Sequence, residues 1–280
     1  MPRVTDVHIH VQPFRMLKPA ALETMKLERP DFDRFLRISD DPAALLDVLD
    51  KSGVERACLI NYVAPEVMGF TAEVNEWVLR YASADRARLI PFGSIHPDHV
   101  KSVAREADRL IKAGIGGFKV HPPHQLLYPD DPRLEPLYAR AEEAGIPVTI
   151  HTGTSIFPGA KSRFGDPMHA DDVAVDHPGL KILLAHAGRP LWGDTAFFLA
   201  RRHANVYLDL SSIPPKRLLT YLPRLEQIAD KVLFGSDWPG PGVPSIRSEV
   251  DAIRALPLRE ETVEKLLVEN ARKVFPPPAP

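Results

Sequence analysis

The sequence contains almost no cysteine: Cys58 is the single one in 280 residues. One cysteine cannot form a disulfide within the chain, so the disulfide-stapled class of small secreted domains is excluded. A reducing compartment such as the cytoplasm fits this composition. Cys58 lies in the apolar run 57–60. We therefore interpret it as a buried strand residue and not as a nucleophile, since no histidine motif flanks it.

The chain also lacks a charge excess and any long hydrophobic run. Its 35 basic and 37 acidic residues leave a net charge of −2, which argues against nucleic-acid or membrane-surface partners. No apolar stretch approaches the roughly 18 residues that span a bilayer. Asp6, His8 and His10 interrupt any apolar core of a secretory signal at the N-terminus. These absences predict a soluble cytoplasmic protein that acts on a small molecule.

Short apolar runs recur along the chain, and helical patterns separate them. Such near-continuous runs are typical of parallel strands covered on both faces. The runs lie at 4–10, 57–60, 89–94, 117–120, 147–150, 181–185, 206–210 and 232–235. The helical patterns include 43–50, 74–81, 100–113, 136–144 and 217–229. Eight strand–helix units predict an α/β protein with a (β/α)₈ TIM barrel. The alternative is an open doubly wound sheet, but no Gly-x-Gly-x-x-Gly turn follows the first run.

The sequence shows no boundary between domains, so we expect residues 1–275 to form a single barrel domain. Residues 11–41 form an unusually long connection after the first strand. Long connections in compact domains are often functional, and this one carries several large apolar side chains. It is predicted to be a lid over the barrel mouth or a contact between subunits of a homo-oligomer. Residues 276–280 are a proline-rich tail that cannot continue a helix.

Polar side chains that can bind metals recur at the ends of the predicted strands. His8 and His10 are two residues apart, so both side chains point to the same face of their strand. The other members are His151, His186, Asp237 and Lys119. A barrel gathers the carboxyl ends of its strands into one pocket. Imidazole and carboxylate groups bind zinc and similar divalent ions, so a shared metal explains why these polar groups recur there. By contrast, His99, His177 and His203 lie in helical or turn sequence and are interpreted as surface residues.

Ordered motifs carry a resemblance to a known family. They are DVHIH at 6–10, GFKVHP at 117–122, His151, LAHAG at 184–188 and FGSDWP at 234–239. Together they resemble the amidohydrolase superfamily, in the amidohydrolase-related branch of metal-dependent TIM-barrel enzymes similar to aminocarboxymuconate semialdehyde decarboxylase. The resemblance covers nearly the whole chain.

The resemblance implies roles for these residues. His8, His10 and His151 would bind the metal, and Asp237 would ligate it or accept a proton from bound water. His186 would orient or deprotonate that water. Zn²⁺ is the expected ion, with Mn²⁺ as an alternative, and one ion is favoured over two. In a binuclear site, a carboxylated Lys119 would bridge two metals and His186 would be a ligand.

Two reaction classes fit these residues. The broader activity of the superfamily favours hydrolysis, in which metal-activated water attacks an ester, lactone or amide of a small molecule. The alternative is a non-oxidative decarboxylase of an unsaturated or aromatic acid, which needs cations to hold carboxylates. Residues near strand ends are predicted to bind the substrate: Lys119, His121, Arg163, Arg189 and Trp238, with His96 and His124 similarly placed. A third hypothesis, a catalytically inactive binding protein, would predict lost ligands, yet every expected position is occupied.

Overall fold

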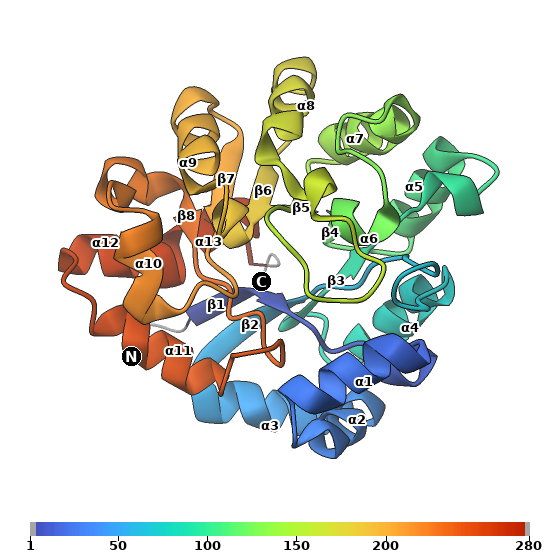
Figure 1. The fold of residues 1–280 in the computed structure, drawn as a ribbon, viewed down its shortest axis with the longest axis horizontal. Coiled ribbons are helices and arrows are strands. Elements are labelled where there is room, and N and C mark those ends of the chain that lie inside the picture. The colour runs from blue at the N-terminus through green and yellow to red at the C-terminus, as the bar shows by residue number, and fades with distance from the viewer. Residues whose placement is uncertain (1–3, 278–280) are drawn as a thin grey trace.

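The computed structural model describes residues 4–277 and shows one eight-stranded parallel sheet (Figure 1). Neighbouring strands follow the order of the chain from β1 to β8. The strands are β1 (Val4–Ile9), β2 (Val54–Leu59), β3 (Leu89–Gly93), β4 (Gly117–Val120), β5 (Val148–His151), β6 (Ile182–Ala185), β7 (Val206–Asp209) and β8 (Val232–Leu233). Each predicted strand is therefore confirmed, with ends that differ by a few residues.

Backbone hydrogen bonds between β1 and the segment that follows β8 close the sheet into a barrel. Val7 N donates to Phe234 O over 3.0 Å, and His10 N donates to Trp238 O over 2.7 Å. The amide of Asp237 donates to His8 O over 2.8 Å. The predicted (β/α)₈ fold is thus confirmed, and its closure links the segment carrying Asp237 directly to the strand carrying His8.

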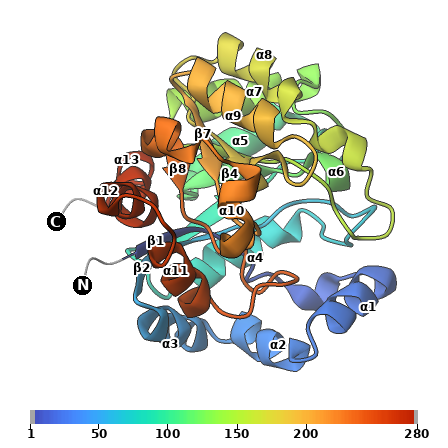
Figure 2. The same ribbon diagram turned by 60° about the vertical axis from the view of Figure 1, so that its left-hand side comes forward.

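Helices surround the barrel, as Figures 1 and 2 show from two directions. They are α1 (Pro19–Glu28), α2 (Phe32–Asp40), α3 (Pro42–Ser52), α4 (Glu73–Ala82), α5 (Val103–Lys112), α6 (Pro122–Gln125), α7 (Glu135–Glu143), α8 (Ala170–Asp176), α9 (Gly193–Arg202), α10 (Pro215–Tyr221), α11 (Ile246–Arg254), α12 (Glu260–Glu264) and α13 (Asn270–Val274). None of the helices within residues 4–277 is long and apolar enough to cross a membrane.

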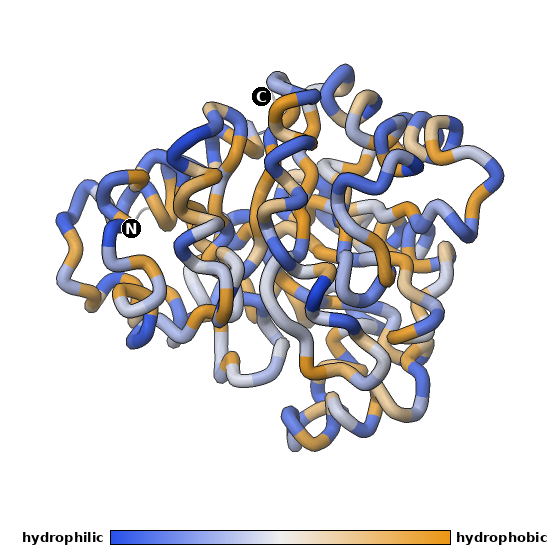
Figure 3. Tube along the Cα trace, turned by 45° about the horizontal axis from the view of Figure 1, so that its top comes forward, coloured by the Kyte–Doolittle hydropathy of each residue, from blue (hydrophilic) through white to orange (hydrophobic). Residues whose placement is uncertain are grey.

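The pattern of α5 illustrates how these helices form and pack. Ser102 caps its start, because the side-chain oxygen accepts a hydrogen bond from Arg105 N. Val103, Ala107 and Leu110 are buried at helical spacing and face the barrel, while charged residues occupy the other face. Figure 3 shows the same alternation of hydrophobic and hydrophilic residues along the outer helices.

Buried residues form two hydrophobic clusters. The larger one lies between the strands and the helices and includes Leu59, Phe118 and Leu184. The smaller one includes Cys58, Phe92 and Phe275, and the rings of Phe92 and Phe275 lie 5.9 Å apart. The interpretation of Cys58 as a buried thiol is confirmed, and burial raises the pKa of the thiol well above its ordinary value. A neutral thiol inside a packed cluster has no nucleophilic role.

The long connection at 11–41 contains a 3₁₀ turn at Phe14–Met16 and the helices α1 and α2. Two local predictions need correction. The helix predicted over 217–229 is instead α10 followed by a 3₁₀ segment, Leu225–Lys231. His177 is buried, where its Nδ1 contacts Glu142 Oε2 at 3.2 Å, so interpreting it as a surface residue was wrong. The tail predicted at 276–280 lies partly outside the described residues.

Candidate metal centre

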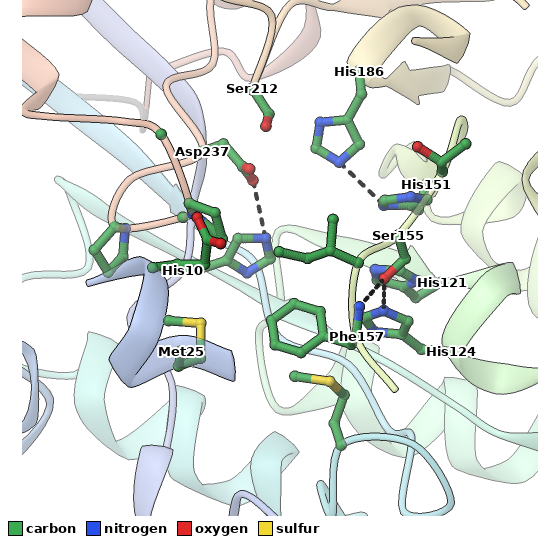
Figure 4. Close-up of a pocket in the computed structure, with 18 of the residues that line it drawn as sticks. His10, Met25, His121, His124, His151, Ser155, Phe157, His186, Ser212 and Asp237 are labelled. Atoms are coloured by element: carbon green, nitrogen blue, oxygen red, sulfur yellow. Dashed lines mark hydrogen bonds and ion pairs between the residues drawn. The ribbon is translucent and has the colours of Figure 1, made fainter. Parts of the chain in front are cut away.

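The predicted ligands come from four strands and meet at the carboxyl ends of those strands. His8 lies in β1 and His10 directly follows it, while His151 is the last residue of β5. His186 is the first residue after β6, and Asp237 lies in the segment after β8. Figure 4 shows His10, His151, His186 and Asp237 around one cavity. The barrel therefore brings together residues that are up to 229 positions apart.

The donor atoms of this group are close together. Nε2 of His8 lies 3.1 Å from Nε2 of His10, and these two nitrogens lie 3.4 and 3.2 Å from Asp237 Oδ1. One donor atom each from His8, His186 and Asp237 also lie within 4.8 Å of one another. His151 joins the group through His186, since its Nδ1 lies 3.1 Å from His186 Nε2. One ion at this position can reach several of these ligands.

Hydrogen bonds determine which nitrogen of each neutral ring carries the proton. A carbonyl oxygen only accepts, so His10 Nδ1 donates to Ile60 O over 3.1 Å. For the same reason, His186 Nδ1 donates to Ser211 O over 2.9 Å. His186 Nε2 is then an acceptor for Nδ1–H of His151. Nε2 of His10 and of His151 are left as lone-pair donors, which is the form of imidazole that binds metals.

His8 is oriented in the same way by a residue that the sequence analysis did not select. Its Nδ1 lies 2.5 Å from Oδ2 of Asp209, at the end of β7. Both side chains are fully buried. The other carboxylate oxygen of Asp209 accepts a hydrogen bond from Ser211 N over 2.9 Å. A carboxylate that holds one ring nitrogen of a histidine points the other nitrogen at a metal. Asp209 ends a strand as His151 does, so the same strand-end pattern was sufficient to find it.

Burial sets the charge of the group. Burial lowers the pKa of His8, His151 and His186 well below the ordinary value, so these rings are neutral at neutral pH. Burial raises the pKa of Asp237, but the hydrogen bond with His10 and the charge of Arg189 outweigh this effect, and the net pKa lies below its usual range. Neutral imidazoles beside an ionised carboxylate form a donor set typical of divalent zinc or manganese.

Two observations show that the residues fit a metal ion. Nε2 of His151 is buried and has no hydrogen-bond partner within the described residues, although an orphaned polar atom is normally unfavourable in a protein interior. In addition, Asp237 and His186 both have a positive φ of 66°. Side chains other than glycine rarely adopt this conformation, and such strain collects at functional sites. A bound ion would coordinate the side-chain donor atoms of His151, His186 and Asp237.

Lys119 lies beside this group but does not line the cavity. It is fully buried in β4, and its Nζ has no hydrogen-bond partner within residues 4–277. Burial lowers the pKa of its ammonium group to about 8, although Asp209 and Asp237 oppose the shift. A buried amine without a partner among the described residues is consistent with both predicted roles, a bridge between metals or a charge partner of the substrate, and both stay hypotheses.

Some of the residues predicted to bind the substrate line one cavity, and others lie outside it. His121, His124 and Arg189 line a cavity of about 500 Å³ that opens from the metal ligands. Trp238 is buried outside this cavity, with its ring 5.3 Å from that of Phe35 in α2. Arg163 is exposed, also outside the cavity, and its guanidinium lies 4.8 Å from the ring of Phe164. Neither of these two is placed to touch a molecule in the cavity.

The cavity wall contains further polar residues that the sequence analysis did not select. Ser155 Oγ lies 2.7 Å from Nε2 of His124, whose Nδ1 lies 3.2 Å from the hydroxyl of Tyr62 (Figure 4). Ser212 accepts a hydrogen bond from Arg189. These residues lie in loops or just after strands, and serine and tyrosine are common in such places. No pattern in the sequence distinguishes them from surface residues.

A second group of potential ligands does not form a comparable site. Donor atoms of Glu66, His96 and His99 lie within 4.8 Å of one another. However, both ring nitrogens of His96 are occupied: Nε2 lies 3.0 Å from Gln125 O, and Nδ1 accepts from Asp98 N over 3.3 Å. The group therefore lacks a free buried donor, and we assign no metal to it.

The chain is similar to several known proteins in sequence or in fold. A curated relative, γ-resorcylate decarboxylase from Rhodococcus jostii, is 26% identical over 40% of this chain and 46% of its own length, so the chain spans less than half of that relative. An uncharacterized TIM-barrel protein from Bordetella bronchiseptica has a TM-score of 0.74 and 23% identity, covering 97% of this chain and 98% of that one.

A third similar protein has a named activity. 5-Carboxyvanillate decarboxylase from Novosphingobium aromaticivorans, solved with manganese and 4-hydroxy-3-methoxy-5-nitrobenzoic acid, has a TM-score of 0.70 and 18% identity. The match covers 98% of this chain and 96% of that one. At such identities the two structures show likeness of fold. The model of the family described as Amidohydrolase matches residues 5–276, which confirms the resemblance indicated by the motifs: this chain belongs to the amidohydrolase family.

Proposed function

We propose that the protein is a metal-dependent, non-oxidative decarboxylase of an aromatic carboxylic acid. The observation that carries this proposal is the position of Arg189, whose guanidinium lines the cavity beside the metal ligands. It follows His186 by three residues, and its side chain donates a hydrogen bond to Ser212, which also lines the cavity. A metal ion and an arginine at one end of a cavity form a site for a carboxylate. The named relatives, two decarboxylases of ring acids, support the same reaction class over the hydrolysis that the sequence analysis favoured.

The chemistry requires a proton at the carbon that loses CO₂, because a carboxylate and a proton yield CO₂ and a C–H bond. A divalent ion bound by His8, His10, His151 and Asp237 would supply positive charge that holds the acid and stabilises negative charge on the ring. Asp237 is ionised and lines the cavity, so it can accept a proton and return it to the ring carbon. The neutral His186 lies beside Asp237, and the hydrogen bond from its Nδ1 to the carbonyl oxygen of Ser211 holds its ring in place.

Apolar walls favour the same reaction. Loss of CO₂ converts a charged group into a neutral molecule, so a site that excludes water from the carboxylate assists the step. Phe14, Met25 and Phe157 line the cavity and limit the water around a bound ring. Zn²⁺ and Mn²⁺ both suit the donor set, and we propose Mn²⁺ for turnover because the decarboxylase from Novosphingobium aromaticivorans was solved with manganese.

The test uses protein stripped of metal and reloaded separately with Mn²⁺ or Zn²⁺. Each form is incubated in D₂O with 2,6-dihydroxybenzoate and with 5-carboxyvanillate, and also with a panel of aryl esters and lactones. The proposal expects CO₂ release and one deuterium at the carbon that carried the carboxylate. Asp237→Asn should abolish both while retaining the fold. Hydrolysis of an ester or lactone without CO₂ release from any ring acid would overturn the proposal in favour of the hydrolase.

A further inference from the structure

The cavity has two ends of opposite character. The metal ligands His10, His151 and Asp237 form one end, together with Arg189. The other side is lined mainly by apolar side chains from three separate segments: Phe14, Leu17, Met25, Met68, Ile156 and Phe157. Two neutral polar side chains lie beside Phe157, because its ring is 5.5 Å from that of His124 and its amide donates to Ser155 Oγ. Figure 4 shows Met25 and Phe157 on the side of the cavity opposite Asp237 and His186. A ring acid held by its carboxylate at the metal end therefore directs its far side toward these apolar residues.

The two ends also differ in charge. Arg189 is the only arginine or lysine among the described residues that line the cavity. Since it follows His186 by three residues and donates a hydrogen bond to Ser212, it belongs to the metal end. Glu28, an exposed acidic residue, also lines the cavity and lies in α1, the helix that supplies Met25. A second carboxylate on the far side of a ring would meet apolar surface and a like charge, which is unfavourable without a cation to pair it.

The size of the cavity leaves space beyond a single ring. Its volume is about 500 Å³, whereas a cavity of about 150 Å³ is enough for benzene. The remaining space lies against apolar side chains, and filling it would remove apolar surface of both partners from water. The free volume, the apolar wall and the lack of a cation at the side far from the metal ligands all favour an apolar substituent on the ring, opposite the carboxylate.

We propose that the cavity selects ring acids with one carboxylate and an apolar substituent opposite it, and rejects acids with a carboxylate at that opposite position. This inference rests on the proposed function, which places the reacting carboxylate at the metal end. It assigns Phe157, Met25 and Ile156 as specificity-determining residues and Glu28 as a group that repels a second carboxylate.

The experiment measures binding and not turnover. Titration calorimetry with Mn²⁺-loaded protein compares benzoate, 4-propylbenzoate and terephthalate, which differ only at the position opposite the carboxylate. We expect 4-propylbenzoate to bind at least tenfold tighter than benzoate, because hydrophobic pockets discriminate at about tenfold or more per buried group. Terephthalate should bind more weakly than benzoate. Equal affinity for all three acids, or tightest binding of terephthalate, would overturn the inference.

Variants assign the effect to residues. Phe157→Ala should reduce the preference for 4-propylbenzoate over benzoate to less than threefold. Ile156→Arg places a cation at the apolar end, and the side chain is 57% exposed, so the fold should tolerate it. That variant should bind terephthalate at least tenfold tighter than the wild type does. Glu28→Gln should improve terephthalate binding severalfold, whereas the control Glu23→Gln, exposed on the same helix outside the cavity, should not.

This design distinguishes the two proposals. CO₂ release without the predicted order of affinities leaves the decarboxylase assignment intact and overturns the inference about specificity. The predicted order of affinities without CO₂ release from any ring acid overturns the assigned reaction and supports the inference about the cavity.

Discussion

Nδ1 of His8 lies 2.5 Å from Oδ2 of Asp209, and both side chains are fully buried. This contact joins β1 to β7 across 201 positions of the chain. It also fixes the ring so that Nε2 faces His10 and Asp237. Burial raises the pKa of Asp209 to about 7, although the Ser211 hydrogen bond and Lys119 oppose the shift. We propose that metal binding by His8 depends on this carboxylate, which would not itself touch the ion.

Replacing Asp209 by asparagine tests this dependence. An amide is a weaker acceptor than a carboxylate, so His8 should be held less firmly as a ligand. We expect Asp209→Asn to weaken metal binding roughly 10–100-fold, the usual range for partners that orient metal-bound histidines. Competition with a fluorescent chelator measures the affinity. The control is Asp50→Asn, an exposed residue of α3, and equal affinity in both variants would contradict the assigned role.

The ligand assignment makes a direct prediction. His8→Ala or His10→Ala should sharply reduce the metal content per chain, because each removes a nitrogen donor, while the barrel stays folded. Elemental analysis of protein prepared without chelators or nickel columns measures the stoichiometry, and circular dichroism checks the fold. A stoichiometry near one supports a single ion, and near two supports a binuclear site with Lys119. Unchanged metal content in both alanine variants would show that the ion binds elsewhere.

Gly235 tests how tightly the centre is packed. A Cβ atom at this position would lie 2.4 Å from Asp209 Oδ1 and 2.7 Å from His8 Cβ, closer than real contacts allow. Gly235→Ala should therefore displace His8 or Asp209 and weaken metal binding at least tenfold. Gly242→Ala is the control, since nothing lies within 4 Å of its Cβ position and only its φ of +76° opposes the change. Similar metal affinities in the two variants would argue against the steric explanation.

Arg29 holds the α1–α2 segment against the segment after β8. Its guanidinium donates to the carbonyl oxygens of Gly240 and Val243 and lies 4.5 Å from the ring of Phe35. We propose that residues 11–41 form a cover over the cavity and that Arg29 fastens it. Arg29→Met should lower the free energy of unfolding by roughly 1–3 kcal/mol, because buried carbonyls lose a charged donor.

Hydrogen exchange shows which elements lose stability in the Arg29→Met variant. It should accelerate in α1 and α2 of Arg29→Met while the barrel strands stay protected. Arg15→Met removes an exposed ion pair with Asp40 from the same segment and should have little effect. Equal exchange in the two variants would contradict the fastening role.

The carboxyl group of Glu249, which is not part of the candidate metal centre, should make the stability of the protein depend on pH. Burial raises the pKa of this half-buried carboxyl from 4.5 to about 7. The folded state therefore holds the proton more tightly, so this contribution to stability is present below about pH 4.5 and is lost as the pH rises through 7. Glu249→Gln removes the dependence. The variant should be more stable than the wild type at pH 8, by on the order of 1 kcal/mol after allowance for solvent screening, and nearly equal at pH 5.

Urea unfolding of the two proteins at both pH values measures this difference. Glu269→Gln, at an exposed position of the C-terminal region, is the control. A stability difference for Glu249→Gln that is the same at pH 5 and pH 8 would show that the carboxyl titrates as it does in the unfolded chain.

Much of this architecture could be read from local patterns. Apolar runs such as 117–120 and 206–210 predicted strands because covered parallel strands must be apolar on both faces. Histidines at the ends of such runs predicted a shared site because a barrel gathers the ends of its strands. The bounds of short helices were less predictable. Leu225–Lys231 has a helical composition, yet it forms a 3₁₀ segment after α10, because packing against the barrel overrides weak propensity.

The sequence alone predicted the barrel through the periodicity of its apolar runs, and its ordered motifs predicted the family by resemblance. Only the tertiary structure decided that Asp209 contacts His8, that Lys119 is buried away from the cavity surface, and that Arg163 and Trp238 lie outside the cavity. The physical reason is that these roles depend on side-chain direction and on contacts between distant segments. A position at the end of a strand fixes where the backbone of a residue lies. Packing in the folded protein determines which atoms its side chain contacts.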